Sequence, residues 1–441
     1  MMNVQVGRRR GARIAIALVG ALMSALLAGG CGGSADDEID EIRVLVAGDP
    51  EELAAYRELV EAFHSSQSDV RVRLEEVAER DELLARLGTS IATGAPVDAF
   101  LLNYRYTGQL VATGAVEPLD DYLEGSSVFG SEEFFEEPLG AFRFDGQQMC
   151  LPQNAASLVV YWNEELFAEA GLDPPAADWT WDDMVEAASA LTRDDDGDGT
   201  VDVYGLGVSP EILRVAPVIW SSGGELVDDP ERPTHLAVRS AEALGAIRSF
   251  LELRAVHGVT PPEEEAEAEP FESRFAAGRL GMLMESRKVV PGLRAAATFA
   301  WDVAPFPTLD EPATVLHSDG YCITSASAAK DDAWRFIEFA LGPEGQRITA
   351  GAGRTVPSLI EVARSATFLD PAEPPASSEV YLDQLEVARP VPTSPAWPRV
   401  EDAANSVLEE AYYETGGRVE AAEVALSLLR ATTPLFAGDG G

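Results

Sequence analysis

The segment 194–202 carries oxygen-bearing side chains at the spacing of a calcium-binding loop. Carboxylates occupy loop positions one, three, five and nine, and a glycine occupies position six. Calcium prefers many oxygen ligands, and this spacing can wrap them around one ion. However, Gly205 stands where the loop needs a glutamate, and the residues after it predict a strand. A structural calcium site and a solvated acidic turn therefore both fit the pattern. The candidate ligands are Asp194, Asp196, Asp198, Thr200 and Asp202.

A polar and aromatic cluster follows an apolar segment that predicts a buried strand. Tyrosine offers a flat apolar face for a sugar ring together with a hydroxyl group, and arginine offers a fork of donors. These side chains are therefore candidates for binding a polar ligand, and the alternative is that they cap the sheet at the surface. The cluster consists of Asn103, Tyr104, Arg105 and Tyr106.

The elements that must position this cluster alternate between strands and helices. A β-α-β-α-β order predicts a parallel sheet with right-handed crossovers. Asp49 follows the first strand, so it is either a second ligand contact or the N-cap of the first helix. Strands are predicted over 42–46, 70–74 and 97–102, and helices over 51–64 and 81–91.

The composition of the chain disfavours several classes of function. Its 441 residues include 75 acidic and 32 basic side chains, which give a formal net charge of -43. This field repels phosphate backbones, so nucleic acid is not expected as a partner. The four histidines lack metal-binding spacing, and the sequence has no nucleophile elbow, phosphate-binding loop or dinucleotide fingerprint. No cofactor is therefore expected apart from the candidate calcium ion.

The N-terminal segment 1–31 has the order of a secretory signal peptide. Arginines precede the apolar run 14–27, which ends in small residues before Cys31. This end resembles a bacterial lipobox, in which the cysteine is lipidated, and the segment 32–40 predicts a flexible tether. We expect an exported protein whose only membrane contact is a lipid on Cys31, at the outer face of a bacterial membrane. Ordinary cleavage near Ala28 is the alternative.

Cys150 and Cys322 are the two cysteines that remain after Cys31. In an oxidising compartment two such cysteines can pair. The alternative is two separate buried thiols that act as small hydrophobic side chains. The sequence leaves this choice open.

Four stretches of the chain carry motifs in a recognisable order and spacing. They are GAPVDAF with GAVEPLD over 94–120, LP, YWNEELF, AGL and WTWD over 151–182, FAAGRLGM over 275–282, and GYCI, AWRFI and VP over 320–357. Together they resemble the extracellular solute-binding proteins of ABC importers, in the family that takes up maltose-like sugars, polyols and related solutes. The resemblance covers nearly the whole chain after Cys31.

This resemblance implies the α/β periplasmic-binding-protein fold, with two lobes that are each a mainly parallel sheet flanked by helices. Hinge strands that cross between the lobes would join them. The first lobe would comprise 41–152 and 324–369, and the second 153–323 and 370–441. Open α/β sheets bind ligands at the carboxyl ends of their strands, so the ligand is expected between the lobes.

The resemblance also implies further ligand contacts. Trp220 stands where the family often keeps a sugar-stacking aromatic residue, with a buried core tryptophan as the alternative. Arg287 and Lys288 replace a segment whose tryptophan faces the cleft in many members. This replacement favours an anionic ligand or a small polyol, and a charge pair at a helix terminus is the alternative. Arg354 and Trp397 are the remaining candidates.

We therefore expect a monomer that closes around a sugar, polyol or sugar acid and delivers it to the permease subunits of an ABC importer. A subunit that senses a solute for a membrane receptor would use the same fold. A lipid-anchored enzyme that acts on glycosides is a third interpretation, which no motif favours. The protein is thus expected not to be an enzyme.

Overall fold

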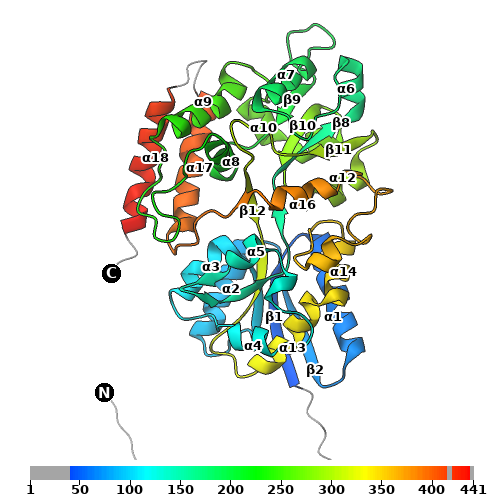
Figure 1. Cartoon of the computed structure of the whole chain (residues 1–441), viewed down its shortest axis with the longest axis vertical. Helices are drawn as coiled ribbons and strands as arrows, with labels where there is room; N and C mark the ends of the chain where they lie inside the picture. Colours follow the sequence, from blue (N-terminus) through cyan, green and yellow to red (C-terminus); the bar gives the residue numbers. More distant parts are fainter. Residues whose placement is uncertain (1–39, 415–419, 438–441) are drawn as a thin grey trace, which may run out of the picture. The chain divides into compact units, whose positions relative to one another are not determined.

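The computed structural model describes residues 40–414 and 420–437, which belong to one compact unit of the chain. The predicted signal peptide, Cys31 and nearly all of the predicted tether lie outside the described residues. Within the described residues, two separate sheets with their own helices form two lobes (Figure 1). No described helix is both long enough and apolar enough to span a bilayer.

The first lobe is built on a mixed five-stranded sheet. Strand β1 pairs in parallel with β2 and β3, which confirms the predicted β-α-β-α-β unit. Strand β13 is antiparallel to both β3 and β6. In sheet order the strands are β2 (Val70–Val77), β1 (Asp40–Ala47), β3 (Ala99–Asn103), β13 (Asp319–Ile323) and β6 (Cys150–Pro152).

The helices of the first lobe follow from local sequence signals. In α1 (Pro50–Ser66), Asp49 is the N-cap and its side chain accepts from the backbone N–H of Glu52. Pro50 fixes the first helical position, and the apolar positions at helical spacing are buried against the sheet. The other helices are α2 (Arg80–Ala92), α3 (Tyr104–Val111), α4 (Asp120–Gly125), α5 (Glu136–Gly140), α13 (Lys330–Leu341), α14 (Pro343–Gly351) and α15 (Ile360–Ala363). The short elements are η1 (Ser131–Glu133), β4 (Arg143–Phe144) and β5 (Gln147–Gln148).

The sheet of the second lobe is less parallel than expected. Strand β8 is antiparallel to β10 and β11, and the parallel pair is β9 with β10. The reason is that β8 enters directly from the first hinge crossing and runs away from the hinge, whereas β10 runs toward it. The strands in sheet order are β11 (Trp301–Ala304), β8 (Val159–Asn163), β10 (Leu280–Glu285) and β9 (Tyr204–Gly207).

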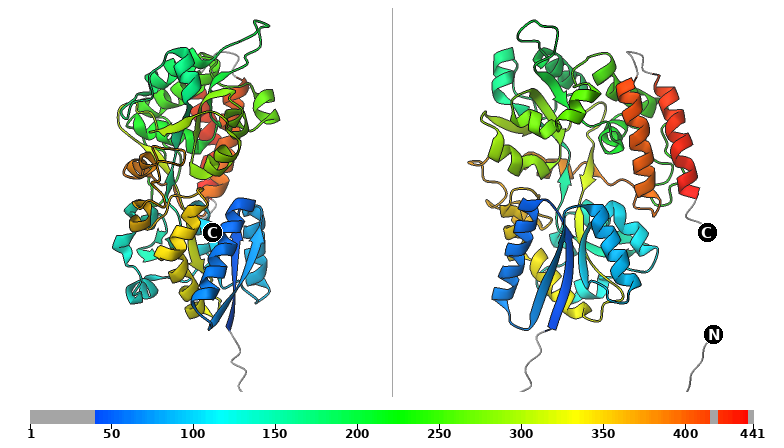
Figure 2. Two further views of the ribbon diagram at one scale, coloured as in Figure 1. Left: turned by 90° about the vertical axis from the view of Figure 1, so that its right-hand side faces the viewer. Right: turned by 180° about the vertical axis from the view of Figure 1, so that it is seen from behind.

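Helices surround this second sheet. The C-terminal pair, α17 and α18, packs along one side of the lobe (orange and red in Figure 2) and contacts α9. The helices are α6 (Glu164–Ala170), α7 (Trp181–Leu191), α8 (Ile212–Ser221), α9 (Ala241–Ala255), α10 (Glu263–Ala268), α11 (Phe271–Ala276), α12 (Val290–Ala296), α16 (Glu379–Leu385), α17 (Trp397–Glu414) and α18 (Ala421–Phe436), with the short η2 (Arg287–Val289).

A small sheet forms the hinge between the lobes. Its order is β14 (Ala388–Arg389), β12 (Thr314–His317) and β7 (Ala156–Ser157). The chain leaves the first lobe between β6 and β7, and it returns between β12 and β13 at Ser318. The return therefore precedes the expected boundary at 324, because β13 is hydrogen-bonded into the first sheet. A third passage joins α15 to α16 through 364–378.

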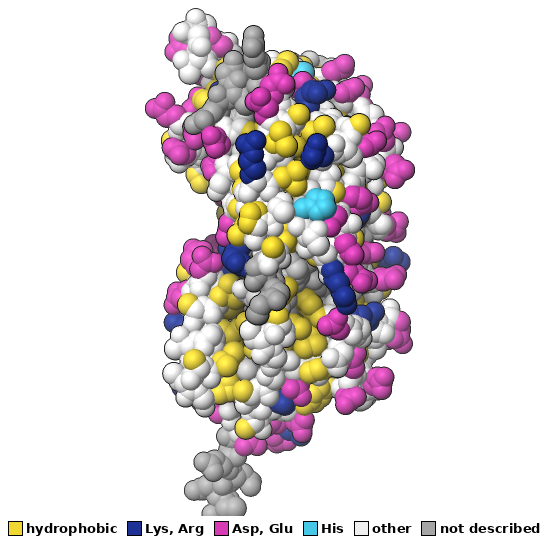
Figure 3. Space-filling model, turned by 90° about the vertical axis from the view of Figure 1, so that its left-hand side faces the viewer, with side chains coloured by type: hydrophobic (Ala, Val, Ile, Leu, Met, Phe, Trp, Pro, Cys, Tyr) yellow, Lys and Arg dark blue, Asp and Glu magenta, His cyan; other side chains and the backbone are white. Residues whose placement is uncertain are grey.

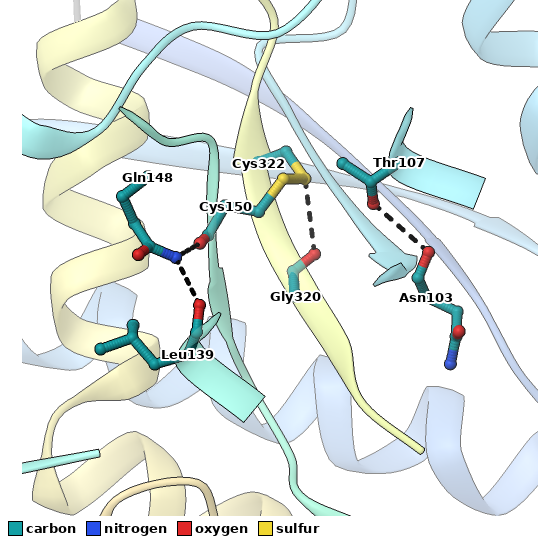
Figure 4. Close-up of a disulfide and its surroundings, with 7 residues drawn as sticks. All are labelled: Asn103, Thr107, Leu139, Gln148, Cys150, Gly320 and Cys322. Atoms are coloured by element: carbon teal, nitrogen blue, oxygen red, sulfur yellow. Dashed lines mark hydrogen bonds between the residues drawn. A yellow bond between two sulfur atoms is a disulfide. The ribbon is translucent and has the colours of Figure 1, made fainter. Parts of the chain in front are cut away.

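Cys150 and Cys322, whose pairing the sequence left undecided, form a disulfide. Cys150 on β6 and Cys322 on β13 are directly opposite in the antiparallel pair, with 4.4 Å between their Cα atoms. Both are fully buried. The amide of Gln148 donates to the carbonyl oxygens of Leu139 and Cys150, at 3.0 and 2.8 Å (Figure 4). The disulfide thus ties the strand that leaves the first lobe to the strand that returns to it.

The surface reflects the acidic composition. On the face drawn in Figure 3, acidic side chains gather along one margin and at the ends, while lysine and arginine side chains are few and scattered. A surface of this charge suits a soluble protein and disfavours polyanionic partners.

Candidate functional site

A cavity of about 720 Å³ lies where the two lobes meet the hinge. The carboxyl ends of β1, β2, β3 and β10 border it, so the loops after these strands supply most of its wall. This is where ligands bind to open α/β sheets. The first lobe contributes residues within 47–53, 78–83, 101–106 and 354–355, the hinge contributes Asn154, Ala156, His317 and Asp319, and the second lobe contributes Ser286 and Lys288.

The structure brings together six of the ten ligand contacts predicted from the sequence. Four come from the carboxyl ends of β1 and β3 and from the start of α3, one lies in η2, and one comes from the loop after α14. Tyr106 is the single tyrosine, phenylalanine or tryptophan in the described lining, and the guanidinium of Arg80 covers its ring at 4.1 Å from the centroid. The six are Asp49, Asn103, Arg105, Tyr106, Lys288 and Arg354.

Two of the remaining four candidates are hinge and core residues. Tyr104 is fully buried, where its hydroxyl donates to the carbonyl oxygen of Leu316 (3.0 Å) and accepts from the N–H of Val391 (3.1 Å). Tyr104 lies outside the lining because successive helical side chains turn by about 100°, so one turn of α3 cannot aim all its residues at the cavity. Trp397 is also fully buried.

The other two candidates lie in the second lobe and do not line the cavity. Trp220 on α8 is 5% exposed, and the guanidinium of Arg389 lies over its ring at 4.9 Å from the centroid. Arg287 is 2% exposed, with its guanidinium 4.4 Å from the ring centroid of Phe368 and 4.9 Å from that of Tyr381. Burial lowers the pKa of Arg287. Its role is therefore to pack between aromatic rings rather than to present a charge to a ligand.

A buried ion pair joins the two lobes at one side of the cavity. The guanidinium of Arg105 pairs with the carboxylate of Glu401 on α17, which also accepts from the indole N–H of Trp397 at 3.1 Å. Burial alone would lower the pKa of Arg105, but the Glu401 carboxylate holds it above its usual value. Arg105 also donates through Nε to the side-chain oxygen of Asn103 at 3.0 Å.

Arg354 links the lobes at the other side. Its guanidinium pairs with Asp49, and its Nε lies 3.0 Å from Oε2 of Glu52. The same guanidinium donates to the backbone carbonyl oxygen of Lys288 at 3.2 Å, which is in the second lobe. Burial raises the pKa of Glu52 to about 7, although the charge of Arg354 opposes the shift.

The shifted pKa of Glu52 predicts a pH dependence of stability. A raised pKa means that the folded state binds more protons than the unfolded state between pH 4.5 and 7, so the free energy of unfolding falls as pH rises through this window. A shift of this size is worth on the order of 3 kcal/mol. We expect Glu52→Gln to abolish this part of the fall between pH 5 and pH 8 in urea unfolding. The exposed neighbour Glu51→Gln is the control, and equal pH profiles for wild type and Glu52→Gln would contradict the assignment.

Lys288 and His317 complete the wall near the second lobe. Burial would raise the pKa of Glu285, but Arg214 (2.8 Å) and Lys288 (3.2 Å) hold it at about 2. His317 lies at the end of β12, where burial and the charge of Arg105 keep its pKa well below the usual value. His317 is therefore neutral at physiological pH.

Two lining residues that sequence reasoning missed form one hydrogen-bonded group with Asn103. Asp319 accepts from the side-chain amides of Asn103 (3.1 Å) and Asn154 (2.9 Å). Glu52 belongs to the Arg354 cluster described above. The only indication in the sequence was the position of these residues along the chain. Asp319 directly precedes the motif at 320–323, and Glu52 lies one helical turn after Asp49. The missed lining residues include Glu52, Asn154 and Asp319.

The candidate calcium loop is an exposed turn between α7 and β9. Ligand atoms of Asp194, Asp196 and Asp202 lie within 4.8 Å of one another. The carboxylate of Asp194 accepts backbone N–H groups of Gly197 (2.7 Å) and Gly199 (2.8 Å), which also stabilise the turn by themselves. Calcium binding stays a prediction, which a calcium titration of the wild type and of Asp194→Asn would test.

Comparisons with known proteins point in one direction. The sequence profile described as bacterial extracellular solute-binding protein matches residues 47–347. A binding protein of Brucella abortus is 24% identical over 386 residues, which cover 85% of this chain and 89% of the relative. The diacetylchitobiose-binding protein of Streptomyces coelicolor is 22% identical over 402 residues, which cover 86% of this chain and 88% of the relative.

Solved structures share the fold. An ABC substrate-binding protein of Listeria monocytogenes in complex with cycloalternan superposes with a TM-score of 0.79. Its sequence is 24% identical, and the match covers 91% of this chain and 99% of that chain. The α/β two-lobed fold expected from the sequence is thereby confirmed.

Proposed function

The chain belongs to the bacterial extracellular solute-binding protein family, and on this premise we propose that it binds a sugar or related polar solute in the cavity between its lobes. The observation that carries the proposal is the set of hydrogen-bonding groups that both lobes and the hinge direct at this cavity. Such a site holds a small ligand through a few oriented polar contacts while its apolar wall excludes water. Family membership also supports a binding protein rather than an enzyme.

Two observations favour a carbohydrate. The names of relatives refer to sugars, namely diacetylchitobiose and cycloalternan. The cavity itself offers amide, carboxylate and guanidinium groups, which match the alternating donors and acceptors of sugar hydroxyls. The described lining has no tryptophan on which a long oligosaccharide could stack, so a small solute fits best.

Delivery to a membrane ABC importer is the second half of the proposal. Closure of two lobes around a solute buries it and creates a shape that a permease can recognise. The predicted lipid on Cys31 would hold the protein at the outer face of the membrane, next to permease subunits. A solute sensor for a membrane receptor would use the same closure, and deletion of the permease genes separates the two, because uptake fails only in an importer.

A thermal-shift screen tests binding. The purified protein is heated with neutral sugars, polyols, sugar phosphates and sugar acids in separate wells. A solute that binds only the folded protein adds about 2.7 kcal/mol of stability at 100 times its Kd. We expect a rise in melting temperature with at least one sugar or polyol. Hydrolysis of a glycoside, together with no stabilisation by any solute, would contradict the proposal.

A further inference from the structure

Asp319 lies where the second hinge crossing enters the first lobe. It is the first residue of β13, directly after the second crossing, and it faces Asn103 in the register of β3 with β13. Asn154, its other partner, lies on the first crossing. The carboxylate is thus held by one residue from the end of a strand in the first lobe and by one from the hinge itself.

The hydrogen bonds fix how the amides around Asp319 are oriented. The side-chain oxygen of Asn103 accepts from Nε of Arg105 at 3.0 Å, so its amide nitrogen must face Asp319. The side-chain oxygen of Asn154 accepts from the backbone N–H of Asp319 at 3.0 Å, which orients that amide in the same way. Because a carboxylate has about four acceptor positions, two amides leave acceptor capacity for a ligand in the cavity.

The cations near Asp319 are engaged by other carboxylates. Arg105 pairs with Glu401, Arg354 with Asp49 and Glu52, and Lys288 with Glu285. Arg80, the fourth cation of the wall, lies 3.4 Å from Asp81 and over the ring of Tyr106. Within the described residues, no lysine, arginine or histidine forms an ion pair with Asp319. A carboxylate or phosphate that enters the cavity would therefore meet the carboxylate of Asp319, which can only accept hydrogen bonds. It would not find a cation that is free of a carboxylate partner among those named. An entering hydroxyl group would find an oriented acceptor.

We propose that Asp319 determines the specificity of the cavity, by accepting hydrogen bonds from hydroxyl groups of an uncharged sugar or polyol and by repelling anionic solutes. This inference rests on the proposed function and names its substrate class. It also reverses the expectation that adjacent cations select an anion, because Arg287 is buried between aromatic rings and Lys288 is paired.

The test compares neutral sugars with their own acids. Glucose with glucuronate and galactose with galacturonate are titrated into the full-length protein by calorimetry. In each bound pair we expect the acid to bind at least about 30-fold more weakly, because like charges at contact distance repel in a partly buried site. Asp319→Asn should weaken the neutral sugar by about 10-fold to 100-fold, the range for losing a hydrogen bond to a charged group. In this variant the affinities for a neutral sugar and for its acid should also differ less than they do in the wild type.

Two further variants keep the test decisive. Asp319→Ser removes the charge without placing an amide nitrogen opposite the amide nitrogens of Asn103 and Asn154. The exposed Asp173→Asn is the control for removal of a charge. If a folded Asp319 variant binds the neutral sugar as wild type does, or if an acid binds more tightly than its neutral partner, the inference is wrong while the proposed function stands. If both Asp319 variants unfold, the ratio of the wild-type affinities for each neutral sugar and its acid tests the inference by itself. If no solute of the thermal-shift screen binds folded wild type, the proposed function fails too.

Discussion

Replacement of both disulfide cysteines by alanine is expected to lower the free energy of unfolding by about 3–5 kcal/mol. The cysteines are 172 residues apart, so the cross-link removes much loop entropy from the unfolded chain. In the folded state it joins β6 to β13, the strands next to two hinge crossings. Urea unfolding of the Cys150→Ala/Cys322→Ala variant and of the wild type, both under oxidising conditions, measures the difference.

The control for this prediction is the wild type under reducing conditions, which keeps both side chains and opens only the bond. Reduced wild type and the double variant should have similar stability. If both lie within about 0.5 kcal/mol of the oxidised protein, which is the range of an ordinary surface substitution, the disulfide does not stabilise the hinge.

The second large effect is expected from the buried ion pair between the lobes. Glu401→Ala should lower the free energy of unfolding by about 3–5 kcal/mol, because it leaves the guanidinium of Arg105 buried without its carboxylate. Glu401 is 6% exposed and Arg105 is 9% exposed, so water cannot replace the lost partner without rearrangement. Chemical denaturation with a signal from the tryptophans measures the loss.

Asp402→Ala, next along α17 and exposed, is the matched control, with an expected change within about 0.5 kcal/mol. The double variant Arg105→Met/Glu401→Leu should recover most of the loss, because an apolar pair of similar volume often replaces a buried ion pair without cost. Equal effects of Glu401→Ala and Asp402→Ala would show that the pair contributes nothing.

The part of the fold that depends on local sequence could be predicted. The alternation of strands and helices over 42–102 was confirmed, because periodicity and capping signals act within one element. Asp49 is both the N-cap of α1 and part of the cavity wall, so the two alternatives for this residue are compatible. Asn103 and Arg105, which the sequence places after a predicted strand, line the cavity, and their contact with a ligand stays a prediction.

The contacts that join distant segments could not be predicted. Asn103 meets Asp319 across 216 residues, and Arg105 meets Glu401 across 296. These pairs depend on the register of β13 and on where α17 packs, and neither has a local signal. Trp220 and Arg287 show the same limit, since the sequence gives their chemistry while packing decides whether they face a cavity or a core.

Calorimetric titration of cavity variants tests whether the solute binds in the cavity between the lobes. The strongest solute from the thermal-shift screen is titrated into wild type, Asn103→Ala, Arg354→Ala and Trp220→Ala, each checked for folding by circular dichroism. We expect Asn103→Ala and Arg354→Ala to lose at least about 10-fold in affinity, as for removed polar contacts, and Trp220→Ala to bind as wild type does. Loss of binding in Trp220→Ala with unchanged binding in the other two would place the solute outside the cavity between the lobes.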